Sequence, residues 1–306
     1  MKDFFKYALA TVVGIFMFFI VLLAFGAMSI VGMIASGESV KNVDENSVMV
    51  LKLSGTMSER SEENPWDRFG GDMLSTPGLQ ETLSAIHKAK TNEDIKGIYI
   101  EAGAFGADFA TMQELRGALE DFKQSGKWII AYGDVYSQGT YYLSSVADKV
   151  YLNPQGQVDW HGLCAEPMFV KDLLAKFGVK MQVVKVGKYK SATEMFTEEK
   201  MSDANREQVQ AYIGGLWKNM CEAVAKSRKL TVAQLNEYAD NMATFDDQQT
   251  LVKKKMIDGL LYTEQVKSEV KKLLKIDADE PISQVSVADM QNVKEEKKDG
   301  EEIAVY

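Results

Sequence analysis

The sequence has few of the side chains on which dense cross-linking, metal sites and histidine-based catalysis depend. Its 306 residues include two cysteines, Cys164 and Cys221, and two histidines, His87 and His161. Two cysteines cannot make the disulfide framework of a small secreted protein, and their separation argues against a metal site. One disulfide and two buried free thiols are both compatible with the sequence. Neither histidine has a convincing serine and carboxylate set around it, so we expect structural roles for both.

An excess of basic charge is also missing. The net charge is -9, and no cluster of lysine and arginine lies on one predicted face. A surface that binds nucleic acid is ordinarily basic, because it has to neutralise phosphates. We therefore expect no nucleic-acid partner, and no motif indicates a metal or any other cofactor.

Charged side chains are absent from Tyr7 to Gly37, and this run is long enough to cross a bilayer. About 20 apolar residues span the hydrocarbon core as a helix. A cleavable signal peptide has an apolar core of about 7–15 residues and a small-residue cleavage site, which Met33-Ile-Ala35 matches poorly. We predict an uncleaved transmembrane anchor over residues 7–36, preceded by a cytoplasmic N-terminus of residues 1–6.

The charges that flank this anchor predict its orientation. Lys2 and Lys6 precede it, whereas Glu38 and Asp44 follow it. Lysines next to a membrane span tend to stay in the cytoplasm, so the body of the chain should lie on the other side. In a bacterium this describes a single-pass protein of the inner membrane, with the lipid bilayer as a partner and a periplasmic body.

After the anchor, short apolar runs alternate with segments of helical periodicity. Runs that have the length and composition of strands begin at Val48, Lys96, Trp128, Lys149 and Val179. Strands that alternate with helices form βαβ units, and such units build a mainly parallel sheet. Because their crossovers are right-handed, we predict a wound α/β core over residues 46–275, which turns helical from Ser202 onward.

The last part of the chain is charged and weakly patterned. We interpret residues 276–302 as a solvated linker. Residues 303–306 resemble the apolar opening of the first strand, Val48 to Leu53. We therefore expect them to be the start of a second, related domain of which the sequence holds only the beginning.

Two lysines occur in the segment Val186-Gly-Lys-Tyr-Lys-Ser-Ala-Thr-Glu-Met-Phe196. A lysine that small and aromatic neighbours shield from water loses hydration, and its pKa falls towards the range of a general base. Most lysines are instead solvated loop charges, and this interpretation applies to Lys188 and Lys190 too. An ion pair between Glu194 and Lys190 would oppose base function, so we expect Glu194 to pair elsewhere, for example with Lys188.

This lysine segment resembles that of the long-form signal peptide peptidase family (protease IV, peptidase family S49). Residues 133–143 and 152–162 are similar to the amino-terminal half of the same family, and the resemblance extends from the anchor to the end of the chain. It implies a fold of the ClpP/crotonase type. It also implies a membrane-anchored serine endopeptidase that degrades cleaved signal peptides, with two tandem α/β domains and a homotetrameric assembly.

The resemblance also assigns roles to individual residues. Lys190 matches the general base of the family. The family's nucleophilic serine lies in a Ser-Gly-Gly turn of the second domain, and Gln138 stands at the equivalent position here. The chain would thus supply the lysine and lack the nucleophile. Gly103 and Gly106 lie where such folds expose backbone amides to an oxyanion. Apart from the resemblance, the position of Ser191 next to Lys190 suits either of two roles, orientation of the amine or a hydrogen bond to a backbone group.

These residues are compatible with three functions. A neutral lysine can activate a serine hydroxyl, so the first is amide hydrolysis with a serine from another domain. The second, favoured for the isolated chain by Gln138, is a non-catalytic module for anchoring and assembly. The third and least favoured is a crotonase-like enzyme acting on acyl-thioesters, because fold does not fix function. Ser137, Ser144 and Ser145 are alternative nucleophiles, although their context predicts capping and packing.

Overall fold

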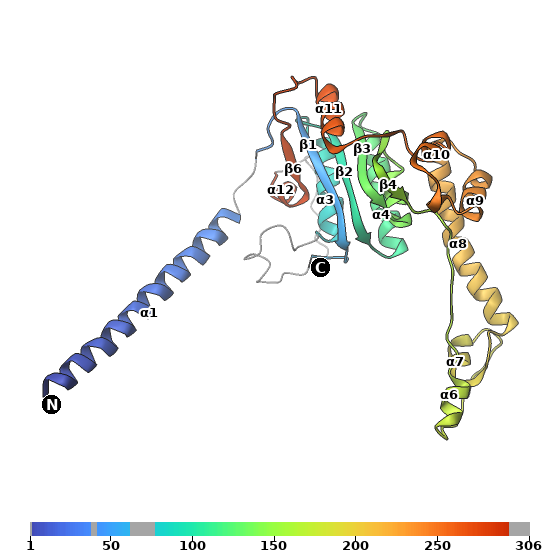
Figure 1. Cartoon of the computed structure of the whole chain (residues 1–306), viewed down its shortest axis with the longest axis horizontal. Helices are drawn as coiled ribbons and strands as arrows, with labels where there is room; N and C mark the ends of the chain where they lie inside the picture. The colour runs from blue at the N-terminus through green and yellow to red at the C-terminus, as the bar shows by residue number, and fades with distance from the viewer. Residues whose placement is uncertain (1, 38–41, 62–76, 294–306) are drawn as a thin grey trace, which may run out of the picture.

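The computed structural model describes residues 2–37, 42–61 and 77–293 (Figure 1). Within them, a six-stranded sheet has the order β5-β4-β3-β2-β1-β6. The bounds are β1 Ser47–Thr56, β2 Ile95–Gly106, β3 Trp128–Tyr136, β4 Lys149–Val158, β5 Gly259–Leu260 and β6 Gln284–Ser286. All neighbouring strands run parallel, which confirms the predicted α/β fold with a mainly parallel sheet.

The helices follow the predicted alternation with the strands and dominate after residue 202. They are α1 Lys2–Gly37, α3 Leu79–Thr91, α4 Phe109–Lys123, α5 Gln138–Ser144, α6 Lys171–Lys176, α7 Glu194–Thr197, α8 Asp203–Arg228, α9 Val232–Asp240, α10 Gln248–Lys253, α11 Thr263–Leu274 and α12 Val287–Gln291. Two short 3-10 helices, η1 Ser191–Thr193 and η2 Ala243–Phe245, complete the set within the described residues. Side-chain oxygens cap several of the N-termini, among them Asp108 on α4 and Ser202 on α8.

Different helices cover the two faces of the sheet. Met49 and Leu51 of β1 belong to the larger core, on the side of α3 and α4. Val48, the residue before Met49, packs instead with Val266 and Val270 of α11 in a smaller core. Successive residues of a strand point to opposite faces, so a near-continuous apolar run is what a sheet covered on both sides requires.

The helix α1 extends away from the body (Figure 1). Its segment Leu9–Gly26 has a mean hydropathy of 2.7, and its side chains are exposed. By length and composition this helix can cross a membrane. The predicted apolar helix is therefore present, and its orientation in a membrane stays a prediction.

The interpretation of residues 276–302 as a linker is wrong for their first part. β6 extends the sheet beside β1, and α12 packs against α3. The amine of Lys88 binds the last carbonyls of α12, including that of Met290. The apolar positions Val285, Val287, Met290 and Val293 are buried, and the many charges between them concealed this pattern in the sequence. Residues 294–306, with the expected start of a second domain, lie outside the described residues.

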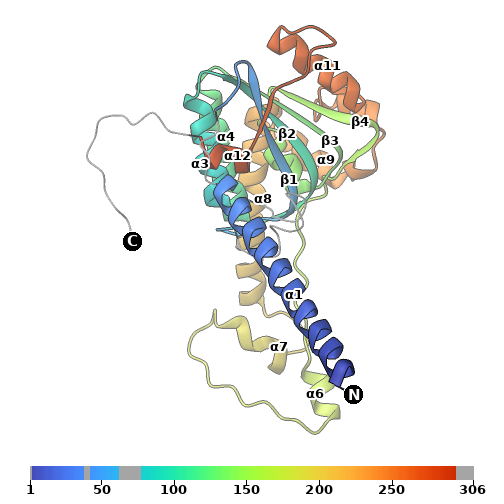
Figure 2. The ribbon, with the colours of Figure 1, turned by 90° about the vertical axis from the view of Figure 1, so that its left-hand side faces the viewer.

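Between β4 and the middle of α8, the chain leaves the body as an arm (residues 163–216). α6 and α7 lie at the far end of this arm, distant from the sheet in both views (Figures 1 and 2). The strand predicted from Val179 to Val186 is wrong: these residues form no strand, and the side chain of Val184 is 99% exposed. A strand needs a neighbour to bind its backbone, and the arm offers none.

Candidate active site

Lys190 lies at the far end of the arm, as the N-terminal cap residue of η1. Its side chain is exposed, and within the described residues its amine makes no hydrogen bond or ion pair. Both neighbours bind α8: the hydroxyl of Tyr189 donates to Glu207 (2.9 Å), and that of Ser191 donates to Gln208 (3.1 Å). The turn that carries Lys190 is thus fixed to α8, while the amine itself is free for a partner.

Glu194 fastens the same turn to the N-terminus of α8. Its buried carboxylate accepts hydrogen bonds from the Ser202 hydroxyl (2.7 Å) and backbone N–H (3.2 Å) and from the Asn205 amide (3.0 Å). These bonds, that from the Ser202 hydroxyl foremost, hold the pKa of Glu194 below its usual value. The expected pairing with Lys188 is wrong, because the amine of Lys188 instead lies over the ring of Tyr189.

Gln138 lies at the opposite end of the arm, where the chain leaves the body. It is the first residue of α5, is buried, and follows the cap residue Ser137. Its Oε1 accepts hydrogen bonds from the N–H groups of His161 and Gly162, each at 3.0 Å. Its Nε2 donates to the carbonyl of Gly162, also at 3.0 Å. At the position where the resemblance requires a serine, this chain therefore has an amide that binds the loop after β4.

Of the three serines of the α5 region, two make structural hydrogen bonds and the third is buried. Ser137 caps α5 by accepting from the N–H of Thr140. Ser145 accepts from Arg116 and donates to the carbonyl of Tyr142. Ser144 is fully buried. These contacts agree with the prediction of capping and packing.

The histidines differ in their surroundings. His87 is exposed on α3, whereas Nε2 of His161 lies 3.1 Å from Oδ2 of Asp159. This carboxylate partner was not predicted from the sequence, although it stands two residues away. The other oxygen of Asp159 accepts from the hydroxyl of Thr244, and within the described residues no serine binds His161. Asp159 therefore connects the end of β4 to η2 and also contacts His161. These contacts agree with a structural role for His161.

The predicted loop around Gly103 and Gly106 is wrong, because both glycines lie in β2. The strand continues to Gly106, whose carbonyl accepts from the N–H of Met57 at 3.0 Å. After a register shift at Gly103, pairing with β1 resumes at Phe105 and Gly106, so this stretch does not form a loop. Thr140 of α5 donates to the carbonyl of Gly103 at 3.4 Å. The structure thus brings Gly103 and Gln138 to the start of α5 and leaves Lys190 at the far end of the arm.

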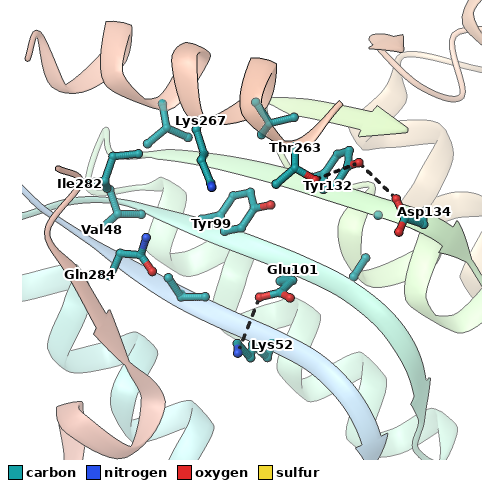
Figure 3. A pocket seen from close by; sticks show the side chains of 15 residues that line it. Val48, Lys52, Tyr99, Glu101, Tyr132, Asp134, Thr263, Lys267, Ile282 and Gln284 are labelled. Carbon is teal, nitrogen blue, oxygen red and sulfur yellow. Dashed lines mark hydrogen bonds and ion pairs between the residues drawn. The ribbon is translucent and has the colours of Figure 1, made fainter. Parts of the chain in front are cut away.

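The cavity in Figure 3 was not foreseen from the sequence and contains none of the predicted site residues. It has a volume of about 360 Å³ and lies between β1–β3 and α11. Tyr99 points into it, and burial raises the pKa of this phenol. Lys52 lies 3.9 Å from Glu101 at its rim, and the hydroxyl of Tyr132 donates to Asp134 at 3.1 Å.

A second hollow, of about 350 Å³, lies beside His161 and Gly162. The described residues contain no group of three or more histidine, cysteine or acidic side chains that could hold a metal. Both cysteines are free thiols, so the disulfide alternative is wrong. The alternative of two buried thiols holds for Cys221 and is wrong for Cys164, which is exposed. Burial raises the pKa of the Cys221 thiol to about 12.

Comparison with known proteins gives a consistent result. The model of the family described as Peptidase family S49 matches residues 121–277. A Protease 4 from Salmonella typhi is 36% identical over 235 residues, and a Protease 4 from Haemophilus influenzae is 32% identical over 223 residues. A protein from Arabidopsis thaliana, Serine protease SPPA, chloroplastic, is 24% identical over 254 residues.

These alignments cover most of this chain and a minority of each relative. They include 73%, 71% and 83% of this chain, in the same order, but 37%, 36% and 36% of the relatives. The chain therefore spans little more than a third of the length of the curated relatives it matches.

Proposed function

The chain belongs to peptidase family S49, and from this premise we propose that it is the lysine-bearing part of a membrane-anchored serine endopeptidase. Lys190 would act as general base. The observation that carries the proposal is the position of this lysine: it is held at the end of an arm, with an amine that is free of partners within the described residues. Gln138 has no hydroxyl, so the nucleophilic serine would come from another domain.

Exposed apolar side chains near Lys190 support a partner surface there. Val184 and Val186 are 99% and 87% exposed, and Tyr189 and Met195 are also exposed. A lysine amine can take a proton only when it is neutral, and removal from water favours the neutral form. We propose that a second domain, or a second copy of this chain, covers this part of the arm and excludes water from Lys190. Contacts of this kind would build the homo-oligomer, which we expect to be a tetramer.

We further propose that α1 anchors the chain in the bacterial inner membrane, with the N-terminus in the cytoplasm and the body in the periplasm. The length and apolar composition of Leu9–Gly26 support this placement. Substrates close to such an anchor would be apolar peptides, and remnants of cleaved signal peptides have this chemistry. No cofactor takes part in a mechanism of this kind, because serine and lysine suffice.

The test is the replacement of Lys190 by alanine in the full-length protein. Loss of a general base lowers kcat by about 10²–10⁴-fold. Lys188→Ala is the matched control, because Lys188 is an exposed lysine of the same turn whose amine lies over the ring of Tyr189. We expect the control to keep its activity and both variants to keep their assembly. Peptidase activity that survives in Lys190→Ala would remove the lysine from the mechanism.

A second function, a non-catalytic module for anchoring and assembly, is favoured by Gln138 at the nucleophile position. On this alternative the complete active site lies in another part of the protein. Lys190→Ala would then leave hydrolysis unchanged, whereas loss of residues 163–216 would dissociate the oligomer. Activity and oligomeric mass measured on the same variants separate the two functions.

A further inference from the structure

Where the chain leaves the body for the arm, a single side chain makes three hydrogen bonds to it. Both the N–H and the carbonyl of Gly162 bind the amide of Gln138, and the N–H of His161 binds it too. We call these three hydrogen bonds the root clamp. We propose that Gln138 is a positioning residue, which fixes the direction of the arm through the root clamp and thereby places Lys190 against its partner. The inference rests on the proposed function, in which Lys190 is the base.

The root clamp lies where the chain ceases to be held by the body. Just before it, Trp160 is fully buried and donates from its indole to the carbonyl of Leu235. Just after it, residues 164–168 are exposed. Gly162 itself has a φ of 88°, which favours glycine and turns the chain outward. Gln138 thus makes the last contacts before the arm begins.

The other end of the arm is attached independently, through the second half of α8. Trp217 packs on Trp160, with ring centroids 4.9 Å apart, and Arg116 donates to the carbonyl of Ala223. One attachment alone would let the arm tilt about it. The root clamp holds the outgoing chain next to this packing, so that both chain segments at the base of the arm are attached to the body.

The length of the arm amplifies any tilt. From Asp203 to Trp217, α8 rises by about 21 Å, at about 1.5 Å per residue. A tilt of about 5° at the root would therefore move its end by about 2 Å. A misplacement of about 1 Å can lower a reaction rate about 10²-fold. Loss of the root clamp should accordingly slow catalysis at a lysine that it never touches.

An amide is suited to this role, and a serine is not. Gln138 provides an acceptor for two N–H groups and a donor for one carbonyl. A serine hydroxyl ends two carbon atoms closer to the backbone and has one hydrogen. The same position therefore cannot serve both as nucleophile and as root clamp, and in this chain it serves as the clamp.

The test compares Gln138→Ala and Gln138→Glu in the full-length protein. Alanine removes all three hydrogen bonds, whereas glutamate keeps an acceptor for the two N–H groups and loses the donor. Asp247→Ala is the control, because it removes the cap of α10 without touching the arm. Nitroxide labels at Lys200→Cys in the arm and Gln124→Cys in the body report the direction of the arm, in a Cys164→Ser background diluted with unlabelled protein.

We expect Gln138→Ala to broaden the distance distribution between the labels and to lower kcat at least tenfold with little change in KM. Gln138→Glu should partly restore the narrow distance distribution and the kcat. Asp247→Ala should change neither the distance distribution nor kcat. An unchanged distribution in Gln138→Ala would overturn the proposal, and so would an activity loss in Asp247→Ala of the same size. A broadened distribution with unchanged kcat would support the root clamp and would count against Lys190 as the base.

Discussion

Glu194 shows how single side chains organise the tip of the arm. Its carboxylate binds Ser202 and Asn205 at the start of α8, and α7 begins with Glu194 itself. The turn with Lys190 immediately precedes this helix. A charged group in this position stabilises the tip only while it is ionised, so the tip should respond to acid.

We predict that acid loosens the tip of the arm in the parent protein. Hydrogen bonds lower the pKa of Glu194 in the folded state, so its unfolded-state pKa, about 4.3, is the higher one. Its contribution to stability is therefore complete above the unfolded value and is lost as the pH falls through the folded one. Amide exchange of residues 202–206, corrected for the intrinsic rate at each pH, should accelerate in this window.

Two variants control this prediction. Glu194→Gln should exchange rapidly at neutral pH already and should show no further acceleration in acid. Glu198→Gln, which changes an exposed carboxylate of the same turn, should behave as the parent protein does. Equal exchange in the parent and in Glu194→Gln at neutral pH would refute the role of this carboxylate.

At the residue scale, the sequence predicted those features whose partners are close along the chain. The helical start at Ser202 is predictable, because a cap binds a backbone group three residues away. Gln138 could be placed only by resemblance, and its contacts were not foreseen. Its partners lie 23 and 24 residues further along, and only the fold brings them together.

At the scale of elements, a buried guanidinium helps to attach α8 to the body. Arg116 of α4 is 2% exposed and donates to the carbonyls of Tyr142 and Ala223 and to the hydroxyl of Ser227. It also forms an ion pair with Glu120 at 3.0 Å. One side chain therefore connects α4, α5 and the part of α8 that supports the arm.

We predict that Arg116→Met destabilises the protein by about 2–4 kcal/mol. The substitution keeps much of the volume but leaves buried carbonyls without donors, each of which costs about 1–3 kcal/mol. Lys226→Met is the control, because Lys226 is exposed and its ion pair with Glu120 should contribute no more than about 1 kcal/mol. Denaturant unfolding measures both, and a loss in Arg116→Met as small as that of the control would contradict the prediction.

Strands were predictable from the sequence where an apolar run in the sequence is also buried in the fold. β1 to β4 were found, because their apolar runs are bounded by turns. The run from Val179 to Val186 has the same composition but lies in the arm, where no strand is available to pair with it. β6 was not predicted, because its three residues lie among many charges and show no clear apolar pattern. They form a strand because they pair with β1.

At the scale of the whole molecule, the predicted site is divided between two ends of one arm. Lys190 lies at its tip, and Gln138 and Gly103 lie at its root. The sequence could not predict this separation, because no residue pattern states how far a loop extends from its domain. In the proposed mechanism the serine comes from another domain or another copy of the chain, so assembly and catalysis would be coupled.

The measurement that tests the account most directly is the structure of the full-length assembly. It gives the distance between Nζ of Lys190 and the nearest serine Oγ of another domain. We predict a separation of about 2.6–3.2 Å, with apolar side chains excluding water from the amine. An amine of Lys190 that faces open solvent, with no serine hydroxyl within reach, would contradict the proposed mechanism.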